Sequence, residues 1–517
     1  MLGLSVRLHS PEPREVALRF DAPWEGKESG YVTVLKDHEG RFRMYYRGGG
    51  ETTREVACVA FSNDGITWTK PQLGLYEHAG SKANNIVYVG QKGAYWETHN
   101  FTPFLDANPE APPESRYKAV GLWRAYPPVT SDRQNALAAL ASSDGIRWRL
   151  MSEKAIIWDG SFDSQNVAFW DVHRGEYVCY FRAGRDGVRS VKRTTSQDFL
   201  TWTAPEWLDF GIGPPEHFYT NAIAPYFRAP SLYLGFPMRF VPERRMVGSS
   251  MKATDGTSDA VLISSRDGLR FDRTFREAFI RPGLSQANWG DAHGNNTPAW
   301  GLLQTAPEEL SIYWCENYGA TPHVRRGVLR LDGFVSVHAP ASGGEMITKP
   351  ILCAGPSLRV NYSTSAAGGI RCEVQDADGN PVPGLTLADS VELFGDEIAG
   401  TMAWKGGANL RALIGKHIRL RFLMRDADLY SVTSGESDAS CLRAPSSTAA
   451  LRLPLLDYFA RDLRPAVEAL GVVFAGMRIL EDHLHNAAAS GPYGMSNVIT
   501  KSLLVQIAHK VARIRLP

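Results

Sequence analysis

Ser62-Asn-Asp64-Gly-Ile-Thr-Trp68 begins with a serine, has an aspartate two positions later and ends on an aromatic ring. The same pattern returns as Ser142–Trp148, Ser196–Trp202 and Ser265–Phe271, and a degenerate fifth copy is Leu331–Phe334. Serine and aspartate side chains hydrogen-bond the backbone of a tight turn, glycine tolerates positive φ, and the aromatic ring can fill the space between neighbouring sheets. We therefore interpret these aspartates as turn residues and not as catalytic groups.

Each copy of the turn closes a unit with the patterning of β-strands. An extended run comes first (YVTVLKD, FTPFLD, NVAFWD, AIAPYF), and an aromatic run follows after a turn (RFRMYYR, RYKAVGLWR, EYVCYFR, SLYLGFP). A fifth unit is TPAWGLLQT, ELSIYWCENY and VRRGVLRL. The copies lie roughly 55 to 80 residues apart, which is the length of one four-stranded sheet with its loops. Sheets repeated around an axis form a propeller, so we predict an all-β fold with a five-bladed β-propeller.

The pattern changes twice after the fifth unit. We assign residues 1–337 to the propeller and interpret APASGGE as a linker. Residues 346–432 alternate strand-like runs with Asp-Gly and Gly-Asn turns, which predicts a β-sandwich accessory domain. Residues 433–517 begin as loops and then place apolar residues at helical spacing. We expect this short helical extension to pack or to mediate self-association rather than to contact a membrane.

Composition excludes several classes of partner. The chain has 517 residues, 44% hydrophobic and 21% charged, with a formal net charge of +1. These values are typical of a globular protein and give no electrostatic reason to expect nucleic acid or an anionic membrane as partner. The six cysteines are scattered without a CxxC motif, so we expect core thiols, no metal site and no cofactor. The first residues lack the basic region of a signal peptide, which predicts a cytoplasmic protein; a periplasmic or secreted parent with a missing N-terminus would give the same sequence.

Several segments carry a family resemblance. DGITWTKPQLGL, FDSQNVAFWD, SSRDGLRFDR and LRLDGFVSV resemble uncharacterised bacterial relatives of glycoside hydrolase family 32. The stretch from MAWKGGANL to RDADLYSV is similar to the sandwich that follows the propeller in those proteins. The resemblance implies the furanosidase-like five-bladed propeller of families 32, 43 and 68, and a carbohydrate as substrate. The chain departs from the sucrose-cleaving members because it has neither a WxNDPNG nor an RDP segment.

Hydrolysis of a glycoside needs two carboxyl groups, one on each side of the scissile bond. The resemblance implies acids at the start of the innermost strands of the first, third and fourth blades. Here these positions hold Glu25, Asp163 and Glu216. We expect Glu216 to be the general acid, Asp163 the stabilising carboxylate that tunes pKa values, and Glu25 the nucleophile or base of an enzyme that cleaves a terminal sugar from an oligo- or polysaccharide. The families have aspartate at the position of Glu25, and Glu28 is its rival.

Polar and aromatic residues beside these acids are predicted to bind the sugar, since they can meet its hydroxyl groups and ring faces. They are Trp24, His99, Asn100, Asn166, His217, Tyr219, Asn221, Arg239 and Trp289. Arg239 and Arg281 could meet a carboxylate, sulfate or phosphate of the substrate, or form salt bridges within the propeller.

Three other functions remain open at this stage. A sugar-binding propeller without hydrolysis is the better account if Glu25, Asp163 and Glu216 do not converge on one pocket. A sialidase is suggested by the Asp-box-like turns, but it would need an arginine cluster and six units where five are found. A phosphorylase requires Arg239 and Arg281 to line the pocket together with other basic groups.

Overall fold

The structure is a computed structural model that describes residues 1–50, 53–90, 96–124, 135–244, 256–290, 293–435 and 452–454. These residues form strands and short 3-10 turns, so the predicted all-β fold is confirmed. The predicted helical extension lies almost entirely outside the described residues.

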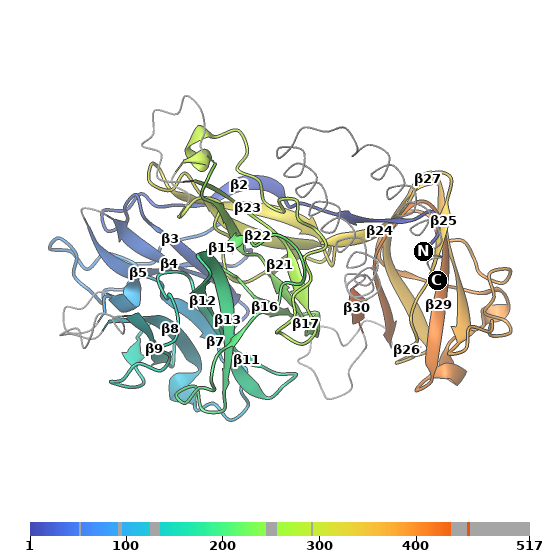
Figure 1. Cartoon of the computed structure of the whole chain (residues 1–517), viewed down its shortest axis with the longest axis horizontal. Coiled ribbons are helices and arrows are strands. Elements are labelled where there is room, and N and C mark those ends of the chain that lie inside the picture. The colour runs from blue at the N-terminus through green and yellow to red at the C-terminus, as the bar shows by residue number, and fades with distance from the viewer. Residues whose placement is uncertain are drawn as a thin grey trace, which may run out of the picture. The chain divides into compact units, whose positions relative to one another are not determined.

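Four-stranded antiparallel sheets form the first three blades of the propeller (Figure 1). The strands of blade one are β3 (Gly30–Lys36), β4 (Phe42–Gly50), β5 (Thr53–Ser62) and β6 (Ile86–Tyr88). The strands of blade two are β7 (Thr102–Leu105), β8 (Tyr117–Arg124), β9 (Asn135–Ser142) and β10 (Arg149–Leu150). The strands of blade three are β11 (Val167–Asp171), β12 (Glu176–Arg185), β13 (Val188–Ser196) and β14 (Glu206–Trp207). In each blade the first strand corresponds to an extended run of the sequence and the second to an aromatic run.

Blade four is divided into two short ladders. One ladder contains β15 (His217–Phe218), β18 (Met238–Val241) and β19 (Thr257–Ala260), and the other contains β16 (Ala224–Tyr226), β17 (Ala229–Gly235) and β20 (Ile263–Ser265). Pro237 lies between β17 and β18, where the residue lacks the N–H that a continuous ladder would require.

Blade five closes the ring with a strand from the beginning of the chain. It contains β21 (Leu303–Ala306), β22 (Glu309–Glu316) and β23 (His323–Arg330), and β2 (Glu12–Arg19) pairs antiparallel with β23. This pairing joins the first and last parts of the propeller, so the five predicted blades are complete.

The Ser-x-Asp elements are turns, as predicted. Asp64 Oδ1 accepts hydrogen bonds of 2.8 Å from the backbone N–H groups of Ile66 and Thr67. The same two bonds recur at the aspartates of the other copies, Asp144, Asp198 and Asp267. The aspartate carboxylates are therefore used within their own turns.

Tyrosines attach three of these turns to the neighbouring blade. The hydroxyl of Tyr45 in blade one donates to the carbonyl of Gly145 in blade two, at 2.9 Å. The hydroxyl of Tyr180 in blade three donates to the carbonyl of Gly268 in blade four, at 2.8 Å. Tyr313 in blade five donates in the same way to the carbonyl of Gly65 in blade one. The repeated element thus fixes both the turn and the spacing of the blades.

A second β-region carries its own hydrophobic core. Its eight strands join in one sheet and are β1 (Ser5–Leu8), β24 (Val335–Ala339), β25 (Gly344–Ile347), β26 (Ile351–Leu352), β27 (Ser357–Asp376), β28 (Asp396–Thr401), β29 (His417–Gly435) and β30 (Arg452–Pro454). The register of β27 against β29 shifts between Thr364 and Gly369, and residues from both halves of β27 enter the same core. The β-sandwich expected for residues 346–432 stays a prediction.

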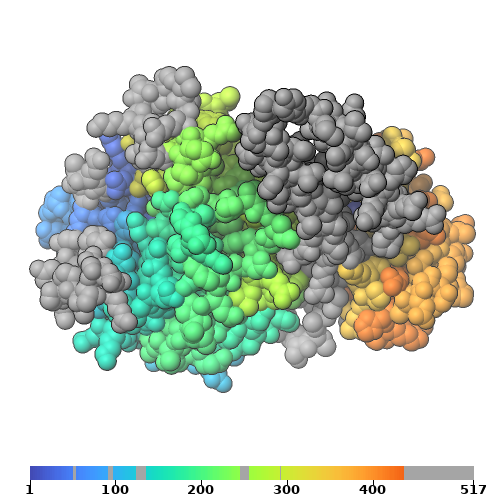
Figure 2. Space-filling view, in the orientation of Figure 1, coloured from blue at the N-terminus to red at the C-terminus, as the bar shows by residue number. Residues whose placement is uncertain are grey.

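The second β-region is longer than the sequence indicates, because β1 lies within the predicted propeller range of 1–337, β24 begins within it at Val335, and the two strands pair with each other. In Figure 2 the propeller surface runs from blue to yellow along the chain, and most of the second β-region is yellow to orange. The five described cysteines are buried and free, and Cys441 lies outside the described residues. Within the described ranges there is no group of three potential metal-ligating side chains and no helix long and apolar enough to cross a membrane.

Candidate functional site

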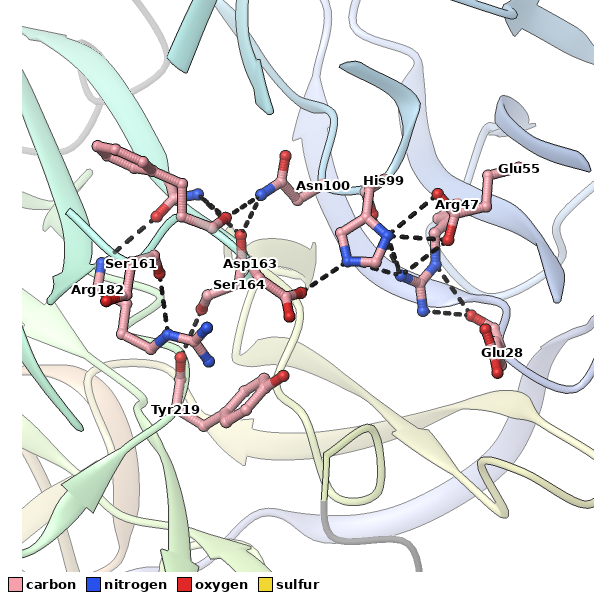
Figure 3. A network of polar contacts seen from close by, with 12 residues as sticks. Glu28, Arg47, Glu55, His99, Asn100, Ser161, Asp163, Ser164, Arg182 and Tyr219 are labelled. Atoms are coloured by element: carbon pink, nitrogen blue, oxygen red, sulfur yellow. Dashed lines mark hydrogen bonds and ion pairs between the residues drawn. The ribbon is translucent and has the colours of Figure 1, made fainter. Parts of the chain in front are cut away.

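Polar side chains gather where the innermost strands of the propeller begin (Figure 3). Glu28 precedes β3, His99 precedes β7, Asp163 precedes β11 and Tyr219 follows β15. Because innermost strands surround the axis of a propeller, the loops before them meet at one end of it. Figure 3 shows the side chains of blades one, two and three joined there by hydrogen bonds.

His99 connects two carboxylates from different blades. Its Nε2 lies 2.8 Å from Oδ1 of Asp163, and its Nδ1 lies 2.8 Å from Oε1 of Glu55 on β5. Both ring nitrogens have an acidic partner, so the doubly protonated imidazolium can donate to both. The second oxygen of Asp163, Oδ2, has no hydrogen bond to a described residue, and its side chain is 55% exposed.

The contacts fix the charges of this group. The hydrogen bond from His99 lowers the pKa of Asp163 to about 2, with a smaller opposing effect of burial. Burial acts to lower the pKa of His99, but the bonds to Asp163 and Glu55 outweigh it and the pKa is raised. Burial likewise opposes ionisation of Glu55, and the bond from His99 leaves its pKa lowered. These hydrogen bonds therefore favour the ionised form of both carboxylates and the protonated form of the imidazole.

Arg47 on β4 holds the blade-one side of the site. Its guanidinium donates to the carbonyl of Glu28 from Nε at 3.0 Å and from Nη2 at 2.6 Å. Nη2 also donates to the hydroxyl of Tyr318 at 2.9 Å, and Nη1 lies 3.6 Å from Oε1 of Glu55. No hydrogen bond or salt bridge to a described residue uses the Glu28 carboxylate, so its backbone is fixed while its acid group stays available.

Arg182 and Arg189 hold the blade-three side. Arg182 on β12 donates from Nε to the carbonyl of Ser161 at 3.0 Å and lies 4.4 Å from the ring centre of Tyr219. Arg189 on β13 lies 5.7 Å from the same ring and 4.8 Å from that of Phe240. Two cations therefore lie beside the ring of Tyr219. Both are close enough to Asp163 to interact electrostatically with its carboxylate.

Glu25 lies apart from this network in the interior of blade one. Its side chain is 0% exposed, its Oε2 accepts from Nζ of Lys70 at 2.6 Å, and its Oε1 accepts from the Tyr46 hydroxyl at 2.6 Å. Trp24 is fixed next to it by a 2.8 Å hydrogen bond from Nε1 to Asn85. The structure uses Glu25 as a buried ion-pair partner, since a carboxylate in the core must be paired.

Glu216 is also tied within its own blade. Its Oε1 accepts from Arg239 at 2.9 Å and its Oε2 accepts from Arg273 at 2.6 Å. Arg239 makes two further bonds to Asp259, at 2.8 Å and 2.6 Å. Arg239 therefore takes the salt-bridge role that the sequence left open, and no contact among the described residues joins Glu25, Asp163 and Glu216.

The three predicted asparagines form hydrogen bonds with backbone groups in and next to the loops of the site. Asn100 and Asn166 are 0% exposed, and both donate side-chain hydrogen bonds to the carbonyls of Phe162 and Ser164. These bonds hold the loop that carries Asp163. Asn221 is 1% exposed, and its Oδ1 accepts from the backbone N–H of Ile223 at 3.1 Å. The amide groups thus hold the backbone of the site in place, and because they are buried they do not contact a substrate.

The remaining predicted binding residues lie on blades four and five. His217 accepts from the backbone N–H of Arg189 at 3.3 Å, and burial lowers its pKa. Tyr219 is 6% exposed and packs on the ring of His293 at 5.4 Å. Trp289 is 38% exposed and donates from Nε1 to the carbonyl of Gly283 at 2.9 Å. His217 and Tyr219 thus adjoin the arginine pair, while no contact among the described residues links Trp289 to the network.

Four residues of the network are absent from the sequence prediction: Arg47, Glu55, Arg182 and Arg189. A signal for two of them exists in the repeat, because the aromatic runs RFRMYYR and EYVCYFR both end in arginine. Arg47 and Arg182 are these final residues. Glu55 and Arg189 lie on the following strands, where no comparable pattern marks them.

A large cavity of about 1700 Å³ lies elsewhere in the described chain. It is lined largely by apolar residues at the opposite ends of the innermost strands, including Phe104, Trp170 and Trp300, and by residues of the second β-region. None of the polar network lines it. Its walls include the ion pair of Arg228 with Asp332. They contain none of the groups of the axial site around His99 and Asp163, where we place the candidate chemistry.

No family model matches the chain, and no curated protein matches it. Among solved structures, a glycoside hydrolase has 12% identity and a TM-score of 0.43, covering 62% of this chain and 92% of its own. An N-acetylgalactosamine deacetylase from F. plautii in complex with blood group B trisaccharide has 12% identity and a TM-score of 0.42, covering 64% and 96%. The α-L-arabinofuranosidase Arb93A from Fusarium graminearum in complex with an iminosugar inhibitor has 14% identity and a TM-score of 0.39, covering 63% and 99%. These TM-scores are too low to support a conclusion about activity, and the resemblance to family 32 stays a prediction.

Proposed function

We propose that the protein is a glycoside hydrolase that cleaves a terminal sugar at the axial site, with Asp163 and Glu28 as its paired carboxyl groups. The observation that carries this proposal is the half-exposed Asp163 carboxylate, which has one oxygen held by a hydrogen bond with His99 and the other without a hydrogen bond to a described residue. Glu28 replaces Glu25 as the blade-one acid, because the Glu25 carboxylate is enclosed in the core.

Asp163 has the properties of the group that stays ionised during glycoside hydrolysis. Its pKa of about 2 keeps it negatively charged at neutral pH, and its free oxygen can face the sugar carbon on which positive charge develops. His99 is a positioning residue in this mechanism, since it holds the opposite oxygen of the carboxylate.

Glu28 is the proposed general acid. Arg47 fixes its backbone through two hydrogen bonds to the carbonyl, and the carboxyl group is not committed to a described partner. A general acid must reach the leaving oxygen with its proton, so a positioned backbone and a free side chain suit this role.

The proposal is tested by Asp163→Asn and Glu28→Gln, assayed on nitrophenyl glycosides that include furanosides and uronides. Each variant should lower kcat by about 1,000-fold, because a positioned acid or base contributes about 100- to 10,000-fold. Asp159→Asn and Glu12→Gln are matched controls on exposed carboxylates, with side chains 67% and 66% exposed. Full activity of either test variant on a substrate that the wild type cleaves would overturn its assignment.

Sugar binding without hydrolysis is the second candidate. The observation that favours it is that no contact among the described residues joins Glu25, Asp163 and Glu216, because Glu25 and Glu216 are used in ion pairs. Hydrolysis remains the first candidate only with Glu28 as the blade-one acid. The two functions separate on the same panel: binding of a sugar by calorimetry with no turnover of any glycoside would support this alternative.

A further inference from the structure

One buried hydrogen-bond donor at the axial site has no partner. Nη1 of Arg182 is buried and makes no hydrogen bond to a described residue, and the residue as a whole is 8% exposed. A buried donor without a partner destabilises a protein, because the hydrogen bonds that it made to water in the unfolded chain are not replaced. Charged groups in protein interiors are normally paired, so this N–H group marks a place where a ligand would complete the structure.

A second arginine lies on the same face of the blade-three hairpin. Arg182 pairs with Val191 in the β12–β13 ladder, and Arg189 pairs with Gly184. Residues two apart on one strand share a face and so do directly opposite residues, which makes Arg182 and Arg189 diagonal neighbours. Gly184 has no side chain between them, and a Cβ atom there would meet nothing within 4 Å. The face is therefore open beside the two guanidinium groups.

The local charge balance favours an anion. Arg189 forms no salt bridge with a described residue, and its contacts are with the rings of Tyr219 and Phe240. Burial and the nearby charge of Arg182 lower its pKa, and Asp163 is the acidic group that opposes this effect. His217 also adjoins Arg189, through the backbone N–H. Two cations thus share one carboxylate, and that carboxylate is already bonded to His99.

We propose that Arg182 and Arg189 bind an oxyanion above the ring of Tyr219, either the carboxylate of an acidic sugar or inorganic phosphate. Planar guanidinium groups bind carboxylates and phosphates through paired N–H donors, and a cation over an aromatic ring keeps its N–H edges free for them. The inference rests on the proposed carbohydrate function and specifies its substrate: a uronic-acid sugar for hydrolysis, or a phosphate co-substrate for phosphorolysis.

Calorimetric titration tests the site without turnover. Galacturonate and glucuronate are titrated against the full chain, with galactose and glucose as their neutral counterparts and inorganic phosphate as a separate arm. Arg189→Gln is the main variant because this side chain is only partly buried, so its replacement should leave the fold intact. Arg182→Gln is the second variant. Arg185→Gln is the matched control, since Arg185 lies on the same hairpin with its side chain 61% exposed.

We expect an anion to bind the wild type and the Arg185→Gln control equally, and to bind both test variants about tenfold more weakly or worse. Uronate binding with this pattern identifies the acidic sugar, and phosphate binding with this pattern identifies phosphate. Binding of neither anion, or equal binding to wild type and Arg189→Gln, would overturn the proposal.

Asp163→Asn separates this inference from the proposed function. Removing the negative charge next to the arginine pair should tighten anion binding while abolishing turnover. If turnover survives in Asp163→Asn and anion binding still depends on Arg189, the catalytic proposal fails and the anion site stands. If turnover is lost and no anion binds, the anion site fails alone.

Discussion

Arg47 in blade one and Arg182 in blade three occupy the same place in their repeats but have different surroundings. Each ends the aromatic run of its second strand. The Nε of each donates a 3.0 Å hydrogen bond to a carbonyl in the loop before the innermost strand, that of Glu28 or Ser161. Each guanidinium also lies over a tyrosine ring, at 4.8 Å and 4.4 Å.

The difference is in the remaining N–H groups. Arg47 donates from Nη2 to the Glu28 carbonyl and the Tyr318 hydroxyl and from Nη1 to the His99 carbonyl, and Nη1 also forms an ion pair with Glu55 at 3.6 Å. Arg182 has no hydrogen bond at Nη1 within the described structure. We call Arg47 a finished clamp, because each nitrogen of its guanidinium group has a partner. We call Arg182 an unfinished clamp, because its Nη1 has no hydrogen bond to a described residue. In a repeated architecture, one copy of an arginine can hold the fold while another copy remains available to bind a ligand.

Replacement of the two arginines by glutamine gives the largest expected difference. Arg47→Gln should lower the free energy of unfolding by about 3–5 kcal/mol, because it leaves the buried partner groups without their cation. Arg182→Gln should cost about 1–3 kcal/mol, since it removes one hydrogen bond and also a donor that has no partner. Urea unfolding of both variants measures the difference.

The effect of a bound anion on stability gives a second test of the difference between Arg47 and Arg182. If the clamp of blade three is completed by an anion, the wild-type protein should gain stability in a saturating concentration of that anion and Arg182→Gln should gain none. Equal losses of stability for the two variants, without ligand, would contradict the distinction between a finished and an unfinished clamp.

Arg239 on β18 of blade four gives a third arginine to compare. It is fully paired with Glu216 and Asp259. Glu216→Gln should lower the free energy of unfolding by about 1.5–3 kcal/mol, the usual contribution of a hydrogen bond to a charged group. Its kcat should equal that of the wild type under the present proposal. Lost turnover with unchanged stability would instead return Glu216 to the role of general acid.

The sequence predicts the blades well because their signals are local. Each Ser-x-Asp turn specifies its own hydrogen bonds, and each run of alternating residues specifies a strand. The closing strand β2 is different, because its partner β23 lies more than 300 residues away and only the completed ring brings them together. The same limit explains why β1 joins the second β-region.

The site is predicted less completely for a related reason. The sequence predicts Asp163 and His99 as candidates because both shortly precede an innermost strand, and the structure joins them by a hydrogen bond. Glu25 and Glu216 satisfy the same rule, yet each turns toward a cation of its own blade, Lys70 or Arg239. Position ahead of a strand does not determine which way a side chain points, and the paired cation decides it. Residues on second and third strands, such as Glu55, reach the axis only through tertiary structure.

Tyr318→Phe makes the clamp of blade one resemble that of blade three. It removes the hydroxyl that accepts the 2.9 Å bond from Nη2 of Arg47. We expect a loss of about 0.5–1.5 kcal/mol in the free energy of unfolding, the net contribution of one hydrogen bond. Tyr76→Phe is the control, because no hydrogen bond to a described residue uses the Tyr76 hydroxyl. Equal effects of the two variants would show that the Arg47 bond contributes nothing of its own.

The smallest expected effect is the pH dependence of the bridge between the two clamps. The pKa of His99 is raised above 6.5, so its bonds to Asp163 and Glu55 stabilise the fold below pH 6.5 and this contribution is lost as pH rises through the folded pKa. The pKa of Asp163 is lowered from 3.8 to about 2, so its contribution is present above pH 3.8 and is lost as pH falls toward 2. Solvent reaches Asp163 and screens the interaction, which keeps the effect small.

Unfolding free energies measured from about pH 5 to 9, across the range in which histidine titrates, test this bridge. The wild type should lose stability above pH 6.5 relative to His99→Gln, whose side chain does not titrate. His78→Gln is the control for a histidine whose ring is outside the network, where it packs against Trp24 at 6.2 Å. Parallel pH profiles for wild type and His99→Gln would mean that His99 does not carry the charge that joins blades one and three.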